Sequence, residues 1–271
     1  MKKLKIALLD LYNGEKTEAI FMIDNLLSRE ISKFSNINFQ YDYFDVRAKD
    51  EIADLTYDIY ISSGGPGSPF DGLNQKWETN YFKLLDDIYN NNQKNSQKKY
   101  LFGICYTFQL MGRFFEFGDV TKRNNLSFGA VKIQKTESGK YDSILTGLPN
   151  TFYGIDNRNW QVVNPNNSKL AAINGKILAM EKLGSKSDKA MMAIRISNEI
   201  FAVQFHPEKN SVYLKKQLEN DYYKKIIINR HGVDAYDEML KAADEPAGVD
   251  LTYNTIIPNF FKEAVNSLKE Q

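Results

Sequence analysis

The sequence has one cysteine and two histidines among its 271 residues. A single cysteine cannot form an internal disulfide, so the fold does not require an oxidising compartment. One cysteine is also too few for a metal site built from several thiolates. With only two histidines, few side chains can serve as a general base near neutral pH.

The sequence also lacks a dominant charge and a long apolar run. It has 35 Lys and Arg against 34 Asp and Glu, a formal net charge of +1. This balance gives no sign of the basic excess that marks nucleic-acid binders. Asp10 interrupts the first apolar run too early for a signal peptide, and no run has membrane-spanning length. We therefore expect a cytoplasmic protein with neither a nucleic-acid nor a membrane partner.

The first half of the chain alternates between strand and helix patterns. Hydrophobic residues make up 42% and charged residues 25%, as in ordinary globular domains. Alternation of this kind predicts parallel βαβ units, a sheet covered on both faces, and functional sites at the carboxyl ends of strands. The predicted strands are 5–11, 38–44, 57–62 and 100–104, and the predicted helices are 20–31, 73–89 and 106–115.

The second half is richer in strand patterns and then becomes helical. The polar run 90–99, NNNQKNSQKK, is predicted to be a surface linker. Nothing divides the chain into independent parts, so residues 1–271 are predicted to form one domain with 209–255 as a helical insertion. His231 is expected at a helix end or turn. The predicted strands are 130–135, 176–181, 191–196 and 201–205, and the predicted helical segments are 209–245 and 256–268.

Cys105 occupies the junction between a predicted strand and a predicted helix. The segment 101–109, LFGICYTFQ, places the cysteine at the apex of a tight turn, as in a nucleophile elbow. The following helix N-terminus favours the reactive thiolate form. A lone cysteine can also be a small buried hydrophobic residue, and this segment alone leaves both interpretations open.

His206 and Glu208 follow an apolar strand in the segment 200–208, IFAVQFHPE. Strand side chains repeat every two residues, so the two can point to the same side, and a carboxylate can then hold an imidazole in one tautomer. Pro207 helps to end the strand. The alternative is a surface histidine beside a surface glutamate.

A glycine-rich loop follows the predicted strand 57–62. The segment 62–71, SSGGPGSPFD, lets backbone N–H groups approach a ligand, and such donors can stabilise a developing oxyanion. No Gly-Lys-Ser/Thr follows, which argues against a phosphate-binding loop. A plain Gly-Pro turn is the alternative.

Together, the three segments resemble the class I, triad-type glutamine amidotransferases, in the same order along roughly residues 5–208. The resemblance implies a flavodoxin-like α/β fold: a mostly parallel central sheet flanked by helices, with a smaller β-rich part and a helical C-terminal insertion. The matching motifs are Gly64-Gly65-Pro66-Gly67, Gly103-Ile104-Cys105 with Gln109, and Gln204-Phe205-His206-Pro207-Glu208.

The resemblance also implies an activity. In such enzymes a thiolate attacks the side-chain amide of glutamine, and a thioester is then hydrolysed. No metal or cofactor is implied. The ammonia would pass to an acceptor, and because no ATP-binding signature is evident, we expect the acceptor on a separate synthetase subunit. The roles implied are nucleophile for Cys105, base for His206, its orienter for Glu208, oxyanion N–H donors for Gly65 and Tyr106, and substrate contacts for Gly67 and Gln109.

Two departures from the family pattern bear on the substrate. Thr107 stands where the family has glycine, and its Cβ could crowd the turn or the substrate amide. The segment 157–160 carries Asn-Arg-Asn-Trp where many relatives have a histidine. Three hypotheses follow: an amidotransferase that works with a separate partner, a free-standing hydrolase of glutamine or another γ-glutamyl compound, and a non-catalytic binding module.

Overall fold

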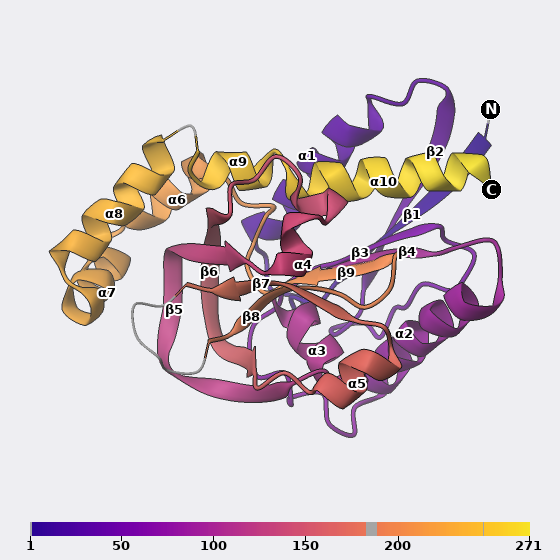
Figure 1. The fold of residues 1–271 in the computed structure, drawn as a ribbon, viewed down its shortest axis with the longest axis horizontal. Helices are drawn as coiled ribbons and strands as arrows, with labels where there is room; N and C mark the ends of the chain where they lie inside the picture. The colour runs from indigo at the N-terminus through magenta and orange to yellow at the C-terminus, as the bar shows by residue number, and fades with distance from the viewer. Residues whose placement is uncertain (1, 183–188, 246) are drawn as a thin grey trace.

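A single nine-stranded sheet runs through the computed structural model, which describes residues 2–182, 189–245 and 247–271 (Figure 1). Its strand order is β2-β1-β3-β4-β9-β8-β7-β5-β6. The strands are β1 Lys2–Asp10, β2 Ile37–Asp45, β3 Ile59–Ser62, β4 Tyr100–Ile104, β5 Asp119–Lys135, β6 Thr151–Val163, β7 Lys176–Glu181, β8 Met191–Arg195 and β9 Ile200–Val203.

The helices fall into those that cover the sheet and those that extend beyond it. The α-helices are α1 Glu18–Ile31, α2 Lys76–Lys94, α3 Tyr106–Phe115, α4 Glu137–Lys140, α5 Asn167–Ala172, α6 Ser211–Leu218, α7 Asp221–His231, α8 Val233–Asp244, α9 Val249–Tyr253 and α10 Ile256–Glu270, and a 3₁₀ turn η1 spans Ser143–Leu145.

The sheet changes from parallel to antiparallel at β9. Strands β2, β1, β3, β4 and β9 pair in parallel, and β9, β8, β7, β5 and β6 pair antiparallel. The central parallel strands β3, β4 and β9 are wholly buried, as expected for a sheet covered on both faces. Their carboxyl ends meet at one edge, where β3, β4 and β9 end side by side.

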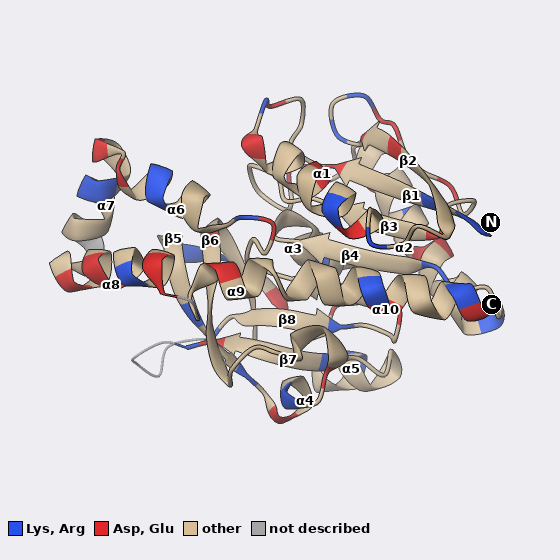
Figure 2. Ribbon diagram, turned by 90° about the horizontal axis from the view of Figure 1, so that it is seen from above, with Lys and Arg blue, Asp and Glu red and all other residues tan. Residues whose placement is uncertain are grey.

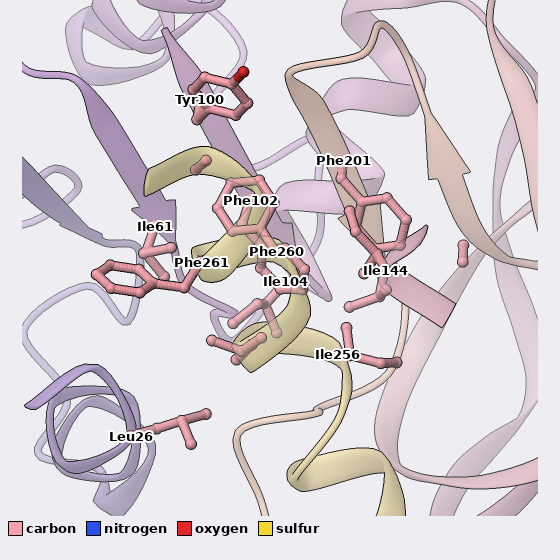
Figure 3. Close-up of a cluster of buried hydrophobic side chains, with 14 of the residues drawn as sticks. Leu26, Ile61, Tyr100, Phe102, Ile104, Ile144, Phe201, Ile256, Phe260 and Phe261 are labelled. Carbon is pink, nitrogen blue, oxygen red and sulfur yellow. The ribbon is translucent and has the colours of Figure 1, made fainter. Parts of the chain in front are cut away.

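Successive residues of the central strands pack into different cores. Phe102 and Ile104 face α1 and α10, where Phe102 stacks on Phe201 with ring centroids 5.5 Å apart (Figure 3). Leu101 faces the opposite core, formed with α2 and α3. This alternation fixes the register, because a one-residue slip would exchange the two faces.

Helices α6, α7 and α8 form a smaller core against the β5–β6 pair. Phe128 of β5 stacks on Tyr223 of α7 with centroids 4.5 Å apart, and Met239 of α8 packs against Gly129. In Figure 2 helix α8 carries mainly acidic residues, with Lys241 as its basic residue, which agrees with the charged helical pattern predicted for this segment. The division of residues 1–271 into one domain with an insertion at 209–255 stays a prediction.

The α/β fold class and the first-half elements are confirmed, but several regions differ from the prediction: strand β5 begins at Asp119 and not at 130, and the short helices α4 and α5 were not predicted. Helix α2 continues to Lys94, so the run 90–99 is only partly a connection. The reason is Asn92, which is buried and exchanges two hydrogen bonds with the backbone of Lys99, at 2.7 and 2.8 Å. Strand β6 was not predicted, because buried charged residues interrupt its apolar pattern.

In the described residues, none of the helices is both long enough and apolar enough to cross a bilayer.

We predict that Asn92→Ala lowers the free energy of unfolding by about 2 kcal/mol, because it leaves the buried N–H and C=O of Lys99 unpaired. Urea denaturation followed by circular dichroism measures this change. The matched control is Gln93→Ala, at an exposed position of the same helix, which should change stability by less than about 0.5 kcal/mol. Equal effects of the two substitutions would contradict the structural role given to Asn92.

Candidate active site

Cys105 stands at the sharp turn between β4 and α3. Its backbone has φ 49° and ψ −94°, in the positive-φ region that side chains other than glycine rarely adopt. The Cys105 N–H donates to the Val203 carbonyl of β9 at 2.8 Å, which ties the turn to the neighbouring strand. Strained backbone of this kind is typical of functional sites. Here the turn places the thiol at the carboxyl edge of the sheet.

His206 and Glu208 follow β9 and form a buried pair. Nδ1 of His206 lies 2.7 Å from Oε1 of Glu208, and the side chains are 4% and 0% exposed. The backbone N–H of His206 donates to the Ile155 carbonyl of β6 at 2.8 Å, which fixes the backbone that carries the ring. Bonding through Nδ1 leaves Nε2 as the nitrogen available for proton transfer.

Gly64 shows how closely the three predicted motifs approach each other. A β-carbon at this position would lie 3.0 Å from Cε1 of His206 and 3.5 Å from Cβ of Cys105. The glycine loop, the thiol and the imidazole thus meet around one point, although they come from three distant segments of the chain. A β-carbon at Gly64 would press on the imidazole, so glycine suits this position.

The charges around His206 favour its protonated form. Burial acts to lower the pKa of His206, and Lys209 acts in the same direction. The charge of Glu208 and the interaction with Cys105 outweigh both and raise this pKa from 6.5 to about 9. Burial likewise acts to raise the pKa of Glu208, but its interactions with His206 bring that pKa below its ordinary value. The imidazolium is the form of this ring that can donate a proton.

Two backbone N–H groups are available near the thiol. In the part of the chain that the structure describes, the N–H groups of Gly65 and Tyr106 donate to no backbone or side-chain acceptor. A β-carbon at Gly65 would lie 2.3 Å from the Leu11 carbonyl oxygen, so only glycine fits there. The arrangement permits both N–H groups to serve as oxyanion donors, the role predicted for them.

Arg47 anchors the glycine loop, although no sequence motif indicates it. Its guanidinium donates to the carbonyl of Pro66 at 2.8 Å and to that of Leu11 at 3.1 Å. It also stacks on the ring of Tyr106, 4.7 Å from the centroid. The Tyr106 hydroxyl in turn donates to the Ser68 carbonyl at 3.0 Å. These contacts hold the loop against the start of α3 and limit its freedom to move away from Cys105.

Thr107 points away from the thiol, into the interface between α3 and the sheet. It is fully buried, its Oγ1 lies 2.7 Å from the hydroxyl of Ser62, and it donates to the Ser63 carbonyl at 2.9 Å. Its methyl group uses the space left by Gly103, where a β-carbon would lie 2.5 Å from Cγ2. The threonine therefore does not crowd the space beside the thiol, contrary to the possibility raised by the sequence.

A cavity of about 350 Å³ opens beside the thiol. It contains predicted site residues, the segment 157–160, and several residues that no sequence motif selects. Glu208, Tyr106 and Thr107 are not among its lining side chains. The lining residues are Tyr12, Glu15, Thr17, Gly65, Pro66, Gly67, Cys105, Gln109, Asn157, Arg158, Asn159, Trp160, His206, Lys209 and Tyr213.

Gln109 and Trp160 form one wall of this cavity. The Gln109 side chain donates to the Trp160 carbonyl at 3.4 Å, so helix α3 is linked to β6. The Trp160 ring packs on Phe70 of the glycine-rich loop, with centroids 5.4 Å apart. The segment that departs from the family pattern therefore borders the cavity.

Arg158 lines the cavity, but two buried carboxylates neutralise its charge. Its guanidinium contacts Asp156 at 2.7 Å and Glu181 at 3.2 Å, and all three residues are buried. Arg123 contacts the same Glu181 at 2.9 Å. This network places two cations against two carboxylates beneath the site. No group of three or more His, Cys, Asp or Glu among the described residues is arranged to hold a metal ion.

Comparison with known proteins extends the match beyond these motifs. The family model for "Glutamine amidotransferase class-I" matches residues 22–226. The chain is 30% identical over 152 residues to a glutamine-hydrolysing GMP synthase subunit from Sulfurisphaera tokodaii, covering 56% of this chain and 68% of that protein. The protein of the same name from Sulfolobus acidocaldarius is 29% identical over 153 residues, with the same coverage.

Solved structures share the fold over nearly the whole chain. A glutamine amidotransferase from Thermotoga maritima superposes with a TM-score of 0.64 at 15% identity, covering 97% of this chain and 98% of that one. The glutaminase domain of CTPS from Trypanosoma brucei, with bound acivicin, gives 0.58 at 14% identity, covering 97% and 94%. The family model covers most of the sequence and includes the nucleophile turn and the His-Pro-Glu segment, and the chain belongs to the class I glutamine amidotransferase family.

Proposed function

We propose that this protein hydrolyses the side-chain amide of glutamine through a thioester on Cys105 and supplies the ammonia to an acceptor. The observation that carries the proposal is the convergence of the strained Cys105 turn, the His206–Glu208 pair and the glycine loop at the edge of one cavity. Residues in this arrangement can attack, protonate and stabilise charge at one carbonyl carbon.

In the first half of the reaction, the Cys105 thiolate adds to the amide carbon, and the carbonyl oxygen becomes an oxyanion. The N–H groups of Gly65 and Tyr106 are the proposed donors to that oxygen. Protonated His206 then transfers its proton to the nitrogen, the C–N bond breaks, and ammonia leaves. The raised pKa of His206 supports this step, because it keeps the ring protonated at neutral pH.

In the second half, neutral His206 removes a proton from water, which attacks the thioester carbon. The C–S bond breaks, glutamate is released, and the thiolate and imidazolium are restored. Glu208 keeps the ring oriented and stabilises its charge in both halves. Gln204 donates weakly toward the thiol, with Nε2 3.8 Å from Sγ, and gives the thiolate a second polar neighbour.

The ammonia acceptor is proposed to lie on a separate synthetase chain. The relatives from Sulfurisphaera and Sulfolobus are both named as one subunit of GMP synthase, which supports a division of labour between subunits. Incubation of the purified chain with glutamine, alone and with a candidate synthetase, tests both parts of the proposal by glutamate release.

We predict that Cys105→Ser and His206→Asn each reduce glutamate release by at least about a thousandfold, because each removes a group needed for thioester chemistry. A coupled glutamate dehydrogenase assay measures the rates. The melting curve of Cys105→Ser should match that of the parent protein, which separates loss of chemistry from loss of fold. His206→Asn leaves the buried Glu208 without its cation, so it should melt at a lower temperature but remain folded at 25 °C. Undiminished turnover in Cys105→Ser would contradict the nucleophile assignment.

A second prediction concerns Glu208→Gln and pH. The charge of Glu208 raises the pKa of His206, so its removal should move the alkaline limb of kcat/KM below the value of about 9 expected for the parent protein. The loss of kcat should be smaller than in His206→Asn. The same raised pKa contributes stability fully below pH 6.5, and this contribution is lost as the pH rises through about 9.

Rates and unfolding free energies measured between about pH 5 and about pH 10 test both statements. If the alkaline limb of kcat/KM were unchanged in Glu208→Gln, the carboxylate of Glu208 would not be the group that raises the pKa of His206.

A third prediction separates structure from substrate binding at Thr107. Thr107→Gly should lower the free energy of unfolding by about 2 kcal/mol, since it removes a buried hydrogen-bonded hydroxyl and adds glycine to a helix. The KM for glutamine should stay within about twofold of the parent value, because the side chain of Thr107 does not line the cavity. Thr107→Ser is the control, because it retains the hydroxyl. A clearly lower KM in Thr107→Gly would show that the threonine does obstruct the cavity.

A further inference from the structure

A second cavity lies between helix α1 and the strands β1 and β2. Its volume is about 800 Å³, which is within the range of small-molecule sites. Cys105 and His206 are not among its described lining residues, and it shares with the catalytic cavity only Glu15 and Thr17 of the β1–α1 loop. It therefore adjoins the catalytic cavity but is a separate space, at the carboxyl ends of two parallel strands.

Two buried carboxylates stand side by side in the lining of this second cavity. Asp10 ends β1 and Asp45 ends β2, and the parallel register of the strands places them opposite each other. They are 4% and 6% exposed. Burial and, to a smaller extent, the charge of Asp45 raise the pKa of Asp10, despite hydrogen bonds from Tyr43 and Tyr12. Like charges in this position repel each other, and burial strengthens the repulsion.

In the described chain no basic residue forms an ion pair with either carboxylate. Arg47 has the smallest of the influences on the pKa of Asp10, and its guanidinium donates to the carbonyls of Leu11 and Pro66. Lys16 is the one basic residue among the described lining residues, and its side chain is exposed. The repulsion between the two carboxylates thus lacks a contacting cation.

Asp45 also has an oxygen without a hydrogen-bond partner. Its Oδ1 accepts from the N–H of Ala48 at 3.1 Å, whereas Oδ2 accepts no hydrogen bond from the described residues. Because the residue is 6% exposed, water solvates this oxygen poorly, and a buried charged oxygen without a donor is costly. A donor that entered the cavity would supply the missing hydrogen bond.

Two aromatic side chains line the same cavity. Phe21 of α1 and Tyr43 of β2 are 65% and 46% exposed, which is unusual for such large apolar groups. The Tyr43 hydroxyl donates to Asp10, so this residue links the aromatic wall to the buried carboxylates. Aromatic rings attract organic cations through their faces and pack against apolar stems. An inorganic cation would use the carboxylates and leave both rings without a contact.

We propose that this cavity binds a primary amine, as an ammonium group carried on an aromatic or alkyl stem. The ammonium group lies against Asp10 and Asp45, where its charge relieves their repulsion and its three N–H donors reach the free Oδ2 of Asp45. The stem packs on Phe21 and Tyr43. This inference goes beyond the proposed function and does not depend on the chemistry at Cys105.

Isothermal titration calorimetry of the full chain with 2-phenylethylammonium tests the need for the charge. Two controls share its stem: 2-phenylethanol is neutral, and 3-phenylpropionate is an anion. The amine should bind at least about tenfold more tightly than the alcohol, because only the amine forms charge-assisted hydrogen bonds, and the anion should not bind.

Equal affinity for the amine and the alcohol would overturn the inference, as would the absence of amine binding at concentrations up to about 20 mM. Magnesium chloride that displaced the amine at matched ionic strength would assign the carboxylates to a metal ion, and it would overturn the inference as well.

Asp45→Asn removes the charge of this residue and keeps the acceptor for the N–H of Ala48. It should weaken amine binding about tenfold or more. The ligand-free variant should melt no lower than the parent protein, because the repulsion with Asp10 is gone. The matched control is Asp237→Asn, the same change at an exposed position of α8, which should bind the amine as the parent protein does. Unchanged amine binding in Asp45→Asn, or a clearly lower melting temperature, would show that the charge of Asp45 serves the fold and not a ligand.

Phe21→Ala tests the aromatic wall at an exposed position, where the substitution leaves the fold intact. It should weaken the binding of 2-phenylethylammonium roughly fivefold and leave that of methylammonium, which has no stem, within about twofold. If the affinity for 2-phenylethylammonium were unchanged, the ring would not contact the ligand and the proposed stem site would be wrong. These measurements use binding and not turnover, so failure of the proposed glutamine hydrolysis would leave their outcome intact.

Discussion

The site depends on the parallel pairing of β4 with β9. Leu101 to Ile104 lie opposite Ile200 to Val203, and the bond from the Cys105 N–H to the Val203 carbonyl continues that pairing one residue beyond the strand. The thiol and the imidazole are 101 residues apart in sequence, from 105 to 206, and this register brings them to one edge of the sheet. Because the two strands contribute alternate residues to two different cores, a shift of one residue would disrupt both cores and the site together.

The antiparallel half of the sheet supports the site from the other side. The Ile155 carbonyl of β6 holds the backbone of His206, and the next residues of that strand form the cavity wall. Asp156 and Arg158 are buried at the base of this wall and are paired with each other and with Glu181. Substitution of one member would leave an uncompensated charge in the interior, which is far more damaging than the loss of a surface pair. The network therefore constrains the shape of the cavity without facing the reacting atoms.

The parts of the protein that were predictable from sequence are those whose signals are local. The turn at Cys105 and the His206–Glu208 pair each lie within nine residues, and the alternation of strand and helix needs only short windows. Arg47 could not be found in this way, because its role depends on contact with Pro66, nineteen residues away, and with the ring of Tyr106. Lys209 is adjacent to a predicted motif, yet only the three-dimensional arrangement shows that it lines the cavity.

The buried position of Cys105 has a consequence for oxidation chemistry. The thiol is 4% exposed and lines a cavity whose volume is about 350 Å³. A sulfenic acid formed there would find no second thiol in this chain with which to close a disulfide. Recovery would then require a reductant small enough to enter the cavity, and a bound amino acid would shield the sulfur from oxidant and reductant alike.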